Sequence, residues 1–180
     1  MRRYRVLAFS SSPFPDVQTD RRVNTDGIVC KENLGLNDSY DTALRESNDF
    51  REVFEVVRRS VKEFLGAERT GLELYLRDLP LGVGAFHKVG TNIIVVNRAL
   101  IDQVVQSQVA LNEMKSFVYS ILLHEYLHSL GIYDELRVRR LTYQISREAL
   151  GEAHPATALA KKGPWAILNW GLTSRGNQWS

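Results

Sequence analysis

The chain has 180 residues, of which 44% are hydrophobic and 24% are charged, and its formal net charge is +2. These proportions are those of a soluble globular domain and argue against a wholly disordered chain. The single cysteine, Cys30, excludes an intramolecular disulfide and favours a reducing compartment. The charge balance does not call for a nucleic-acid or membrane partner, and we expect neither.

The first part of the chain, residues 1–48, reads as an irregular N-terminal segment. Residues 4–9 favour a short strand, and residues 10–40 mix Pro, Asp, Asn, Gly and Ser with little periodicity. The apolar run at residues 6–9 is shorter than the roughly 7–15 residues of a signal peptide. No stretch approaches the roughly 18 apolar residues of a membrane span. We therefore expect a cytoplasmic protein whose folded domain covers residues 49–180.

The folded domain begins with a predicted helix and a small sheet. Asp49 and Glu52 have the spacing of a capping box, an apolar stripe of helical period follows over residues 50–65, and Gly66 ends it. Alternating or β-branched residues predict strands at 72–76, 84–88 and 92–97, with a hairpin turn at 89–91.

Three further helices are expected, at residues 99–108, 112–130 and 135–150. The second has Asn112 as its N-cap and is apolar almost all round, which is typical of a central, buried helix. In the tail, residues 164–168 are expected to pack back onto the domain. The fold class is therefore α/β (α+β), with a sheet of three to four strands, a buried active-site helix and a following helix.

The segment that carries chemistry is His-Glu-Tyr-Leu-His-Ser-Leu-Gly-Ile-Tyr-Asp, residues 124–134. His124 and His128 are four residues apart, so both side chains lie on one helix face and can bind one cation. Imidazoles suit Zn²⁺, which lowers the pKa of a bound water towards about 7. Glu125, next in sequence, is placed to accept the proton of such a water as a general base.

Zinc requires a third protein ligand, and the reach of the chain favours one of three candidates. Gly131 allows a sharp turn that brings Asp134 under the metal. A helix over residues 135–150 is about 24 Å long, which carries Glu148 and His154 away from the site. We therefore favour Asp134 as the third ligand. The alternative for Asp134 is the N-cap of the following helix.

The motif resembles that of the zincin metallopeptidases, in the metzincin-like form His-Glu-x-x-His-x-x-Gly-x-x-Asp, and snapalysin-type enzymes are similar in having Asp in the third position. The resemblance covers about residues 121–135 together with the order of elements around them. Metzincins place a methionine downstream of the motif, whereas both methionines here, Met1 and Met114, lie upstream.

The resemblance implies a zinc-dependent metallopeptidase with one catalytic zinc, held by His124, His128 and Asp134, with Glu125 as the general base. Its substrate is then a peptide or protein, held along an edge strand for which residues 84–97 are the candidate hairpin. Two alternatives stay open. One is a metal-dependent hydrolase of another substrate such as RNA, and the other is a zincin-shaped binding protein without catalysis.

Other residues have weaker functional interpretations. His87 on the expected hairpin is either a cleft donor or an ordinary strand histidine. Cys30 is either a latency ligand for zinc or a buried small side chain. The arginines of the third helix favour a solvated face over a nucleic-acid site; they are Arg137, Arg139, Arg140 and Arg147.

Overall fold

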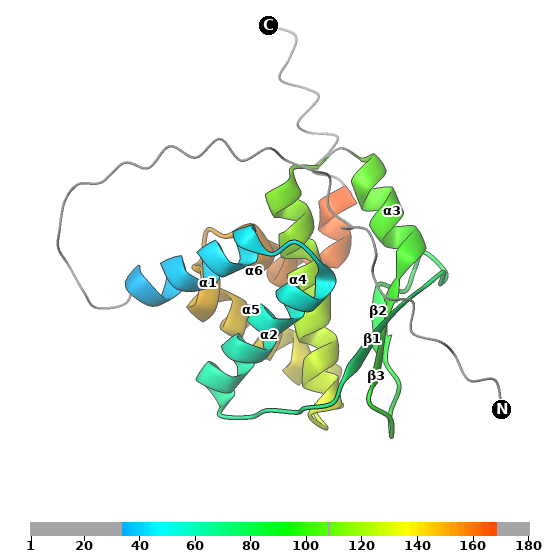
Figure 1. The fold of residues 1–180 in the computed structure, drawn as a ribbon, viewed down its shortest axis with the longest axis horizontal. Coiled ribbons are helices and arrows are strands. Elements are labelled where there is room, and N and C mark those ends of the chain that lie inside the picture. The colour runs from blue at the N-terminus through cyan, green and yellow to red at the C-terminus, as the bar shows by residue number, and fades with distance from the viewer. Residues whose placement is uncertain (1–33, 108, 169–180) are drawn as a thin grey trace, which may run out of the picture.

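The computed structural model describes residues 34–107 and 109–168 (Figure 1). The strand expected at residues 4–9, the interpretation of Cys30 and the tail beyond residue 168 lie outside this part of the chain. Within it, the expected α/β class is confirmed, with six α-helices and one three-stranded mixed sheet among the described residues.

The elements follow one another with short connections. In chain order they are α1 (Leu34–Glu46), α2 (Phe50–Leu65), β1 (Glu73–Arg77), β2 (Ala85–His87), β3 (Ile93–Asn97), α3 (Arg98–Gln106), α4 (Leu111–Ser129), α5 (Glu135–Leu150), α6 (Pro155–Lys162) and a 3₁₀ turn, Pro164–Ala166. Helices α1, α2, α4, α5 and α6 gather on one side of the molecule, and the sheet lies on the other side, beside α4, together with α3 (Figure 1).

The sheet has the order β1-β3-β2, so β3 is its central strand. β1 pairs with β3 in parallel, and β2 pairs with β3 in antiparallel orientation. The turn between β2 and β3 contains Gly90 at a φ of 77°, a left-handed conformation that glycine adopts without steric cost. The hairpin expected over residues 84–97 is therefore confirmed, and β2 forms the sheet edge next to α4.

Helix α4 is the centre of the molecule, as its all-round apolar sequence predicts. It packs against α1, α2, α5, α6 and β2. Its aromatic residues Phe117, Tyr119 and Tyr126 have no exposed surface, and the two tyrosine hydroxyls still find partners. Tyr119 lies 3.0 Å from the Ser60 hydroxyl, and Tyr126 accepts the backbone N–H of Arg69 at 2.8 Å. Burial on every face fixes the position of the histidines near its C-terminal end.

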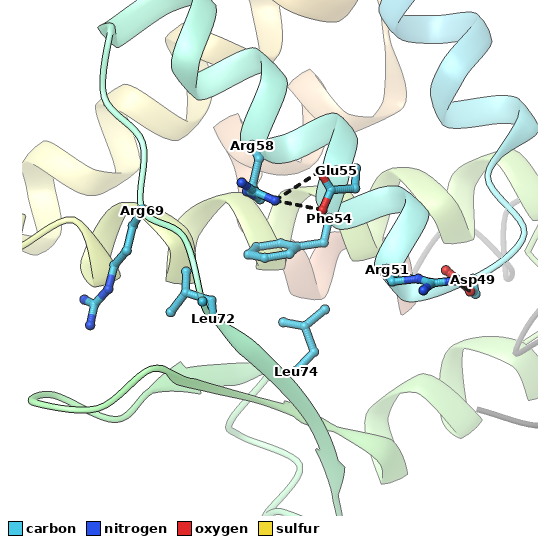
Figure 2. Close-up of a pocket in the computed structure, with 9 residues that line it drawn as sticks. Asp49, Arg51, Phe54, Glu55, Arg58, Arg69, Leu72 and Leu74 are labelled. Atoms are coloured by element: carbon cyan, nitrogen blue, oxygen red, sulfur yellow. Dashed lines mark hydrogen bonds and ion pairs between the residues drawn. The ribbon is translucent and has the colours of Figure 1, made fainter. Parts of the chain in front are cut away.

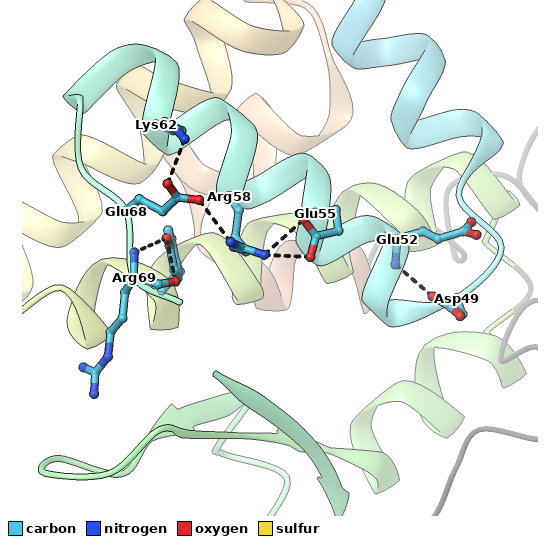
Figure 3. Close-up of polar contacts among 8 residues, drawn as sticks. Asp49, Glu52, Glu55, Arg58, Lys62, Glu68 and Arg69 are labelled. Atoms are coloured by element: carbon cyan, nitrogen blue, oxygen red, sulfur yellow. Dashed lines mark hydrogen bonds and ion pairs between the residues drawn. The ribbon is translucent and has the colours of Figure 1, made fainter. Parts of the chain in front are cut away.

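Helix α2 has the boundaries that its sequence predicts. The Asp49 side chain accepts the backbone N–H of Glu52 at 2.8 Å (Figure 3). Gly66 ends the helix at a φ of 62°. On the outer face, Glu68 lies 2.8 Å from Lys62 and 3.0 Å from Arg58 (Figure 3). These pairs attach the segment after α2 to the helix that precedes it.

Three local expectations are corrected. The segment 1–48 is not irregular throughout, because α1 forms within it and buries Tyr40 and Leu44 in the core. That helix has little intrinsic support from its Asn, Asp and Ser residues, so tertiary packing stabilises it. Helix α6 was not expected; Pro155 at its first position and Gly163 after its end are its local signals.

Helix α4 begins one residue earlier than its sequence predicts. Asn112 is not the N-cap, because the helix begins at Leu111, after Ala110. The carboxylate of Glu113 accepts the backbone N–H of Ala110 at 3.1 Å, which satisfies a donor just before the first turn.

In the tail, Ile167 is fully buried, so the expectation that residues 164–168 pack back is confirmed. No helix of the described ranges is long and apolar enough to cross a membrane.

Candidate metal centre

Helix α4 carries both motif histidines on one face. Their rings lie 4.8 Å apart between centroids, and their Nε2 atoms are 3.1 Å apart. The His124 side chain is 24% exposed and the His128 side chain is 20% exposed, so solvent can reach both. The i, i+4 spacing of the motif therefore brings two imidazole nitrogens to one point, as the sequence predicts.

The third member of the group is Glu135, the first residue of α5. Its Oε2 lies 3.5 Å from His124 Nε2 and 3.4 Å from His128 Nε2. Ligands at about 2.0–2.1 Å from a tetrahedral zinc are separated from one another by about 3.3–3.4 Å. The three side chains thus have the separation that a tetrahedral cation requires, and their donor atoms, two imidazole nitrogens and a carboxylate oxygen, suit zinc.

Asp134 precedes this residue and has a different role in the structure. Its Oδ1 accepts the backbone N–H of Arg137 at 2.8 Å, so Asp134 is the N-cap of α5. This is the alternative that the sequence left open. Gly131, at a φ of 88°, makes the turn between α4 and α5 as expected. The role of Asp134 as a ligand stays a prediction, and Glu135 is the carboxylate that the structure brings to the histidines.

The two more distant candidates lie elsewhere. Helix α5 runs unbroken from Glu135 to Leu150, so the reach argument against Glu148 and His154 holds. Glu148 pairs with Arg147 at 2.6 Å. His154 is the N-cap of α6, and its Nε2 lies 3.2 Å from Asp41 of α1. Neither belongs to the group formed by His124, His128 and Glu135.

The surroundings orient His128 for ligation. Its Nδ1 lies 2.9 Å from the carbonyl oxygen of Ile132, which can only accept a hydrogen bond. The Nδ1 atom therefore carries the proton, and the lone pair of Nε2 points to the group. A backbone carbonyl that fixes the tautomer in this way is the usual outer partner of a metal-binding histidine.

The pKa values of His124 and Glu135 both lie below the ordinary values of their groups. Burial lowers the pKa of His124, against the opposing effect of Glu135, so this imidazole stays neutral to a lower pH. Burial also acts to raise the pKa of Glu135, but the hydrogen bond from Arg139 and the two histidines outweigh it and hold that pKa below its ordinary value. Neutral imidazole and ionised carboxylate are the forms that bind a cation.

Glu125 lies between the metal group and the sheet edge. It is only 8% exposed, and its Oε2 accepts the backbone N–H of His87 on β2 at 2.7 Å. Burial raises the pKa of Glu125, and the His87 N–H and the charge of His128 oppose this effect. A buried carboxylate with a raised pKa is a better proton acceptor than an exposed one.

His87 contributes its backbone to the site, whereas its side chain points elsewhere. The Nε2 atom lies 3.1 Å from the carbonyl of Thr91 within the same hairpin. The side chain is 8% exposed and does not line the cleft that His124, Glu125 and Glu135 share. The geometry therefore favours the structural interpretation of this histidine over a cleft donor.

A cleft of about 720 Å³ opens beside the metal group. One wall is the backbone before and at the start of β2, residues 82–85, and the floor includes Ile121 and Leu159. His124, Glu125 and Glu135 line it together with further residues of α5, α6 and the 3₁₀ turn. The cleft is therefore large enough for several residues of a peptide to reach the metal group.

Arg69 holds the hairpin against the end of α4. Its guanidinium donates to the carbonyl oxygens of Ser129 and Thr91 and, at 2.8 Å, to the side chain of Asn92. Its backbone N–H bonds to the Tyr126 hydroxyl (Figure 3). One residue thus joins the loop after α2, the C-terminus of α4 and the β2–β3 turn, which keeps β2 beside Glu125.

A second cavity, of about 430 Å³, lies between α2 and β1 (Figure 2). Phe54, Leu72 and Leu74 form its apolar surface. The Arg58 side chain at its margin is paired with Glu55 (Figure 2) and with Glu68. The Arg69 side chain is bonded to the carbonyl oxygens of Ser129 and Thr91. Among the described residues, the group that could hold a metal ion lies at the larger cleft and not at this cavity.

Comparison with protein-family models, with curated proteins and with solved structures finds no match for this chain. The assignment of a function therefore rests on the geometry of the site. That geometry includes one residue, Glu135, that the sequence analysis did not select. The available signal was the preference for Asp at helix N-caps, which assigns Asp134 to the cap and leaves Glu135 as the next carboxylate.

Proposed function

We propose that His124, His128 and Glu135 hold one zinc ion and that the chain is a zinc-dependent hydrolase of peptide bonds. The observation that carries the proposal is the mutual separation of the three ligand atoms, 3.1–3.5 Å, with Glu125 lining the same cleft. Three protein ligands with a fourth position left for water are typical of catalytic zinc sites, whereas structural sites have four protein ligands.

A bound zinc would supply a Lewis acid that acidifies water and polarises a carbonyl group. The protein's own part is proton transfer and positioning. Glu125 accepts a proton from the attacking water and returns it to the leaving amine, and its raised pKa suits both steps. The hydrogen bond from His87 holds one carboxylate oxygen and leaves the other available to the water.

The edge strand supports a peptide as the substrate. The backbone N–H of Lys88 donates to the carbonyl of Ile93, and the N–H of Asn97 donates to the carbonyl of Gly84. In this register the backbone groups of the even-numbered residues from 84 to 88 face β3. Ala85 therefore turns its backbone N–H and C=O away from β3, at a position that lines the cleft. An extended peptide can pair with such an edge by β-augmentation.

The test is metal content and hydrolysis measured on the same preparations. Tag-free protein is expected to contain one zinc per chain by mass spectrometry, and His128→Ala is expected to contain none. Glu125→Gln keeps the metal and loses hydrolysis of a fluorogenic peptide mixture by a factor of at least about 100. Full hydrolysis by Glu125→Gln would disprove the mechanism, and hydrolysis of RNA instead of peptide would support the alternative substrate.

A further inference from the structure

The cleft that contains the metal group has walls of different charge. The wall before and at the start of β2, residues 82–85, carries no charged side chain. The residues of α5 and α6 that line the cleft include four cations, namely Arg139, Arg140, Lys161 and Lys162. The acidic residues that line the cleft are Glu125 and Glu135, and both belong to the proposed catalytic centre.

Two of the four cations already interact with carboxylates of the protein. Arg139 lies 3.0 Å from Glu135 and helps to hold that carboxylate ionised. Lys161 lies 3.8 Å from Glu152 and stacks over the Tyr143 ring at 5.8 Å. These contacts use part of the positive charge within the protein itself.

Arg140 and Lys162 differ from the other two. Both side chains are exposed, and neither has an ion-pair partner among the residues that the structure describes. Arg140 lies one residue after Arg139 on α5, and Lys162 is the last residue of α6, so two elements present them to one cleft. Two exposed cations that line the same cleft attract a ligand of opposite charge and disfavour a cationic one.

We propose that Arg140 and Lys162 make this cleft selective for peptides with acidic side chains next to the bond that is cut. The proposal rests on the proposed function and adds the class of substrate. The edge backbone of Ala85 aligns the peptide, the partly exposed Val83 and Trp165 contact its apolar parts, and the two cations bind a carboxylate. An RNA strand fits less well, since base stacking needs an open aromatic face, and Lys161 and Arg147 already lie over the Tyr143 ring, each 5.8 Å from its centroid.

The experiment compares two sets of fluorogenic peptides. The acidic set contains Asp and Glu, and the amide set has Asn and Gln at the same positions. The zinc-loaded wild type is expected to hydrolyse the acidic set about tenfold more efficiently, in kcat/KM, at low salt. Arg140→Gln combined with Lys162→Gln brings the ratio close to one, and Arg140→Glu combined with Lys162→Glu inverts it. Arg137→Gln, an exposed cation on α5 outside the cleft, is the matched control and keeps the wild-type ratio.

Binding separates this inference from the proposed function. Anisotropy of labelled acidic and amide peptides is measured with zinc-loaded Glu125→Gln, in which hydrolysis is blocked. A preference for the acidic peptide that requires Arg140 and Lys162 supports the inference even where no peptide is hydrolysed. Equal binding of the two peptides overturns it, and so does tighter binding of an eight-nucleotide single-stranded RNA through the same two residues.

Discussion

At the scale of single residues, the site depends on which of two adjacent carboxylates faces the histidines. Asp134 caps α5 through the Arg137 N–H, and this leaves Glu135 to approach the two imidazoles. The two carboxylates are adjacent in the chain, but Asp134 has a structural role and Glu135 has the role of a ligand in the proposed zinc site. Substitutions at the two positions therefore have separable effects.

Glu135→Gln is expected to weaken zinc binding by at least about tenfold, because it removes a charged ligand from the group. Asp134→Ala is expected to leave zinc binding within about threefold and to lower the free energy of unfolding by about 1 kcal/mol, the usual cost of losing an N-cap. Zinc affinity by competition with a chelating dye and urea denaturation of the metal-free proteins measure the two effects. The opposite pattern would assign Asp134 as the ligand, as the sequence predicted.

Glu125 gives a prediction on pH. Its pKa is raised in the folded protein because the carboxylate is buried. The stabilisation linked to this group is thus complete below its ordinary pKa and is lost as the pH rises through the raised value. Metal-free Glu125→Gln, whose amide oxygen can still accept the His87 N–H, is expected to have a higher Tm than the wild type at pH 7 and no advantage at pH 4. Equal differences in Tm at both pH values would contradict the prediction.

At the scale of elements, the site is the meeting point of α4, α5 and the edge strand β2. Local sequence places the two histidines on α4, but the position of β2 depends on contacts between distant segments. Arg69 makes several of these contacts, to Ser129, Thr91 and Asn92. The hairpin therefore depends on a residue that lies outside it and outside the motif.

Arg69→Ala is expected to lower the free energy of unfolding by about 2 kcal/mol, because the partly buried carbonyl oxygens of Ser129 and Thr91 lose a charged donor. Urea denaturation of metal-free protein measures the change. The matched control is Arg51→Ala, an exposed arginine of α2 whose carboxylate partner lies 3.8 Å away and whose loss is expected to cost less than about 0.5 kcal/mol. Equal losses in the two variants would show that Arg69 does not hold the hairpin.

At the scale of the whole molecule, α4 forms the core and one of its ends forms the site. The fully buried residues of α4 fix its position, while the side chains of His124 and His128 remain accessible near the cleft. A cation held by α4 and the start of α5 would bind the folded chain only, since the unfolded chain has no preformed group of ligands. The proposed metal binding would therefore be linked to global stability.

Zinc at about 100 times its dissociation constant is expected to raise the free energy of unfolding by about 2.7 kcal/mol. For a chain of this size this corresponds to a rise in Tm of roughly 5–10 °C. Thermal unfolding with and without zinc measures the shift, which is expected to vanish on adding a chelator and to be absent in His128→Ala. An unchanged Tm in the wild type would argue against a preformed site.

Much of the local structure follows from the sequence alone. The caps of α2, the three strands, the hairpin turn and the buried character of α4 are short-range patterns whose physical causes lie within a few residues. The pairing of His124 with His128 is of the same kind, because helical geometry alone sets it. For the same reason Gly131 predicts the turn that ends the motif.

Tertiary structure decided the rest. Helix α1 forms because Tyr40 and Leu44 find a core to pack against, which their own segment does not indicate. The choice of Glu135 over Asp134 depends on the direction in which α5 leaves the turn, and the contact between Glu125 and the N–H of His87 joins residues 38 positions apart. The cationic wall of the cleft likewise combines α5 and α6. Local sequence determines which groups are available, and only the packing of distant elements determines which of them meet.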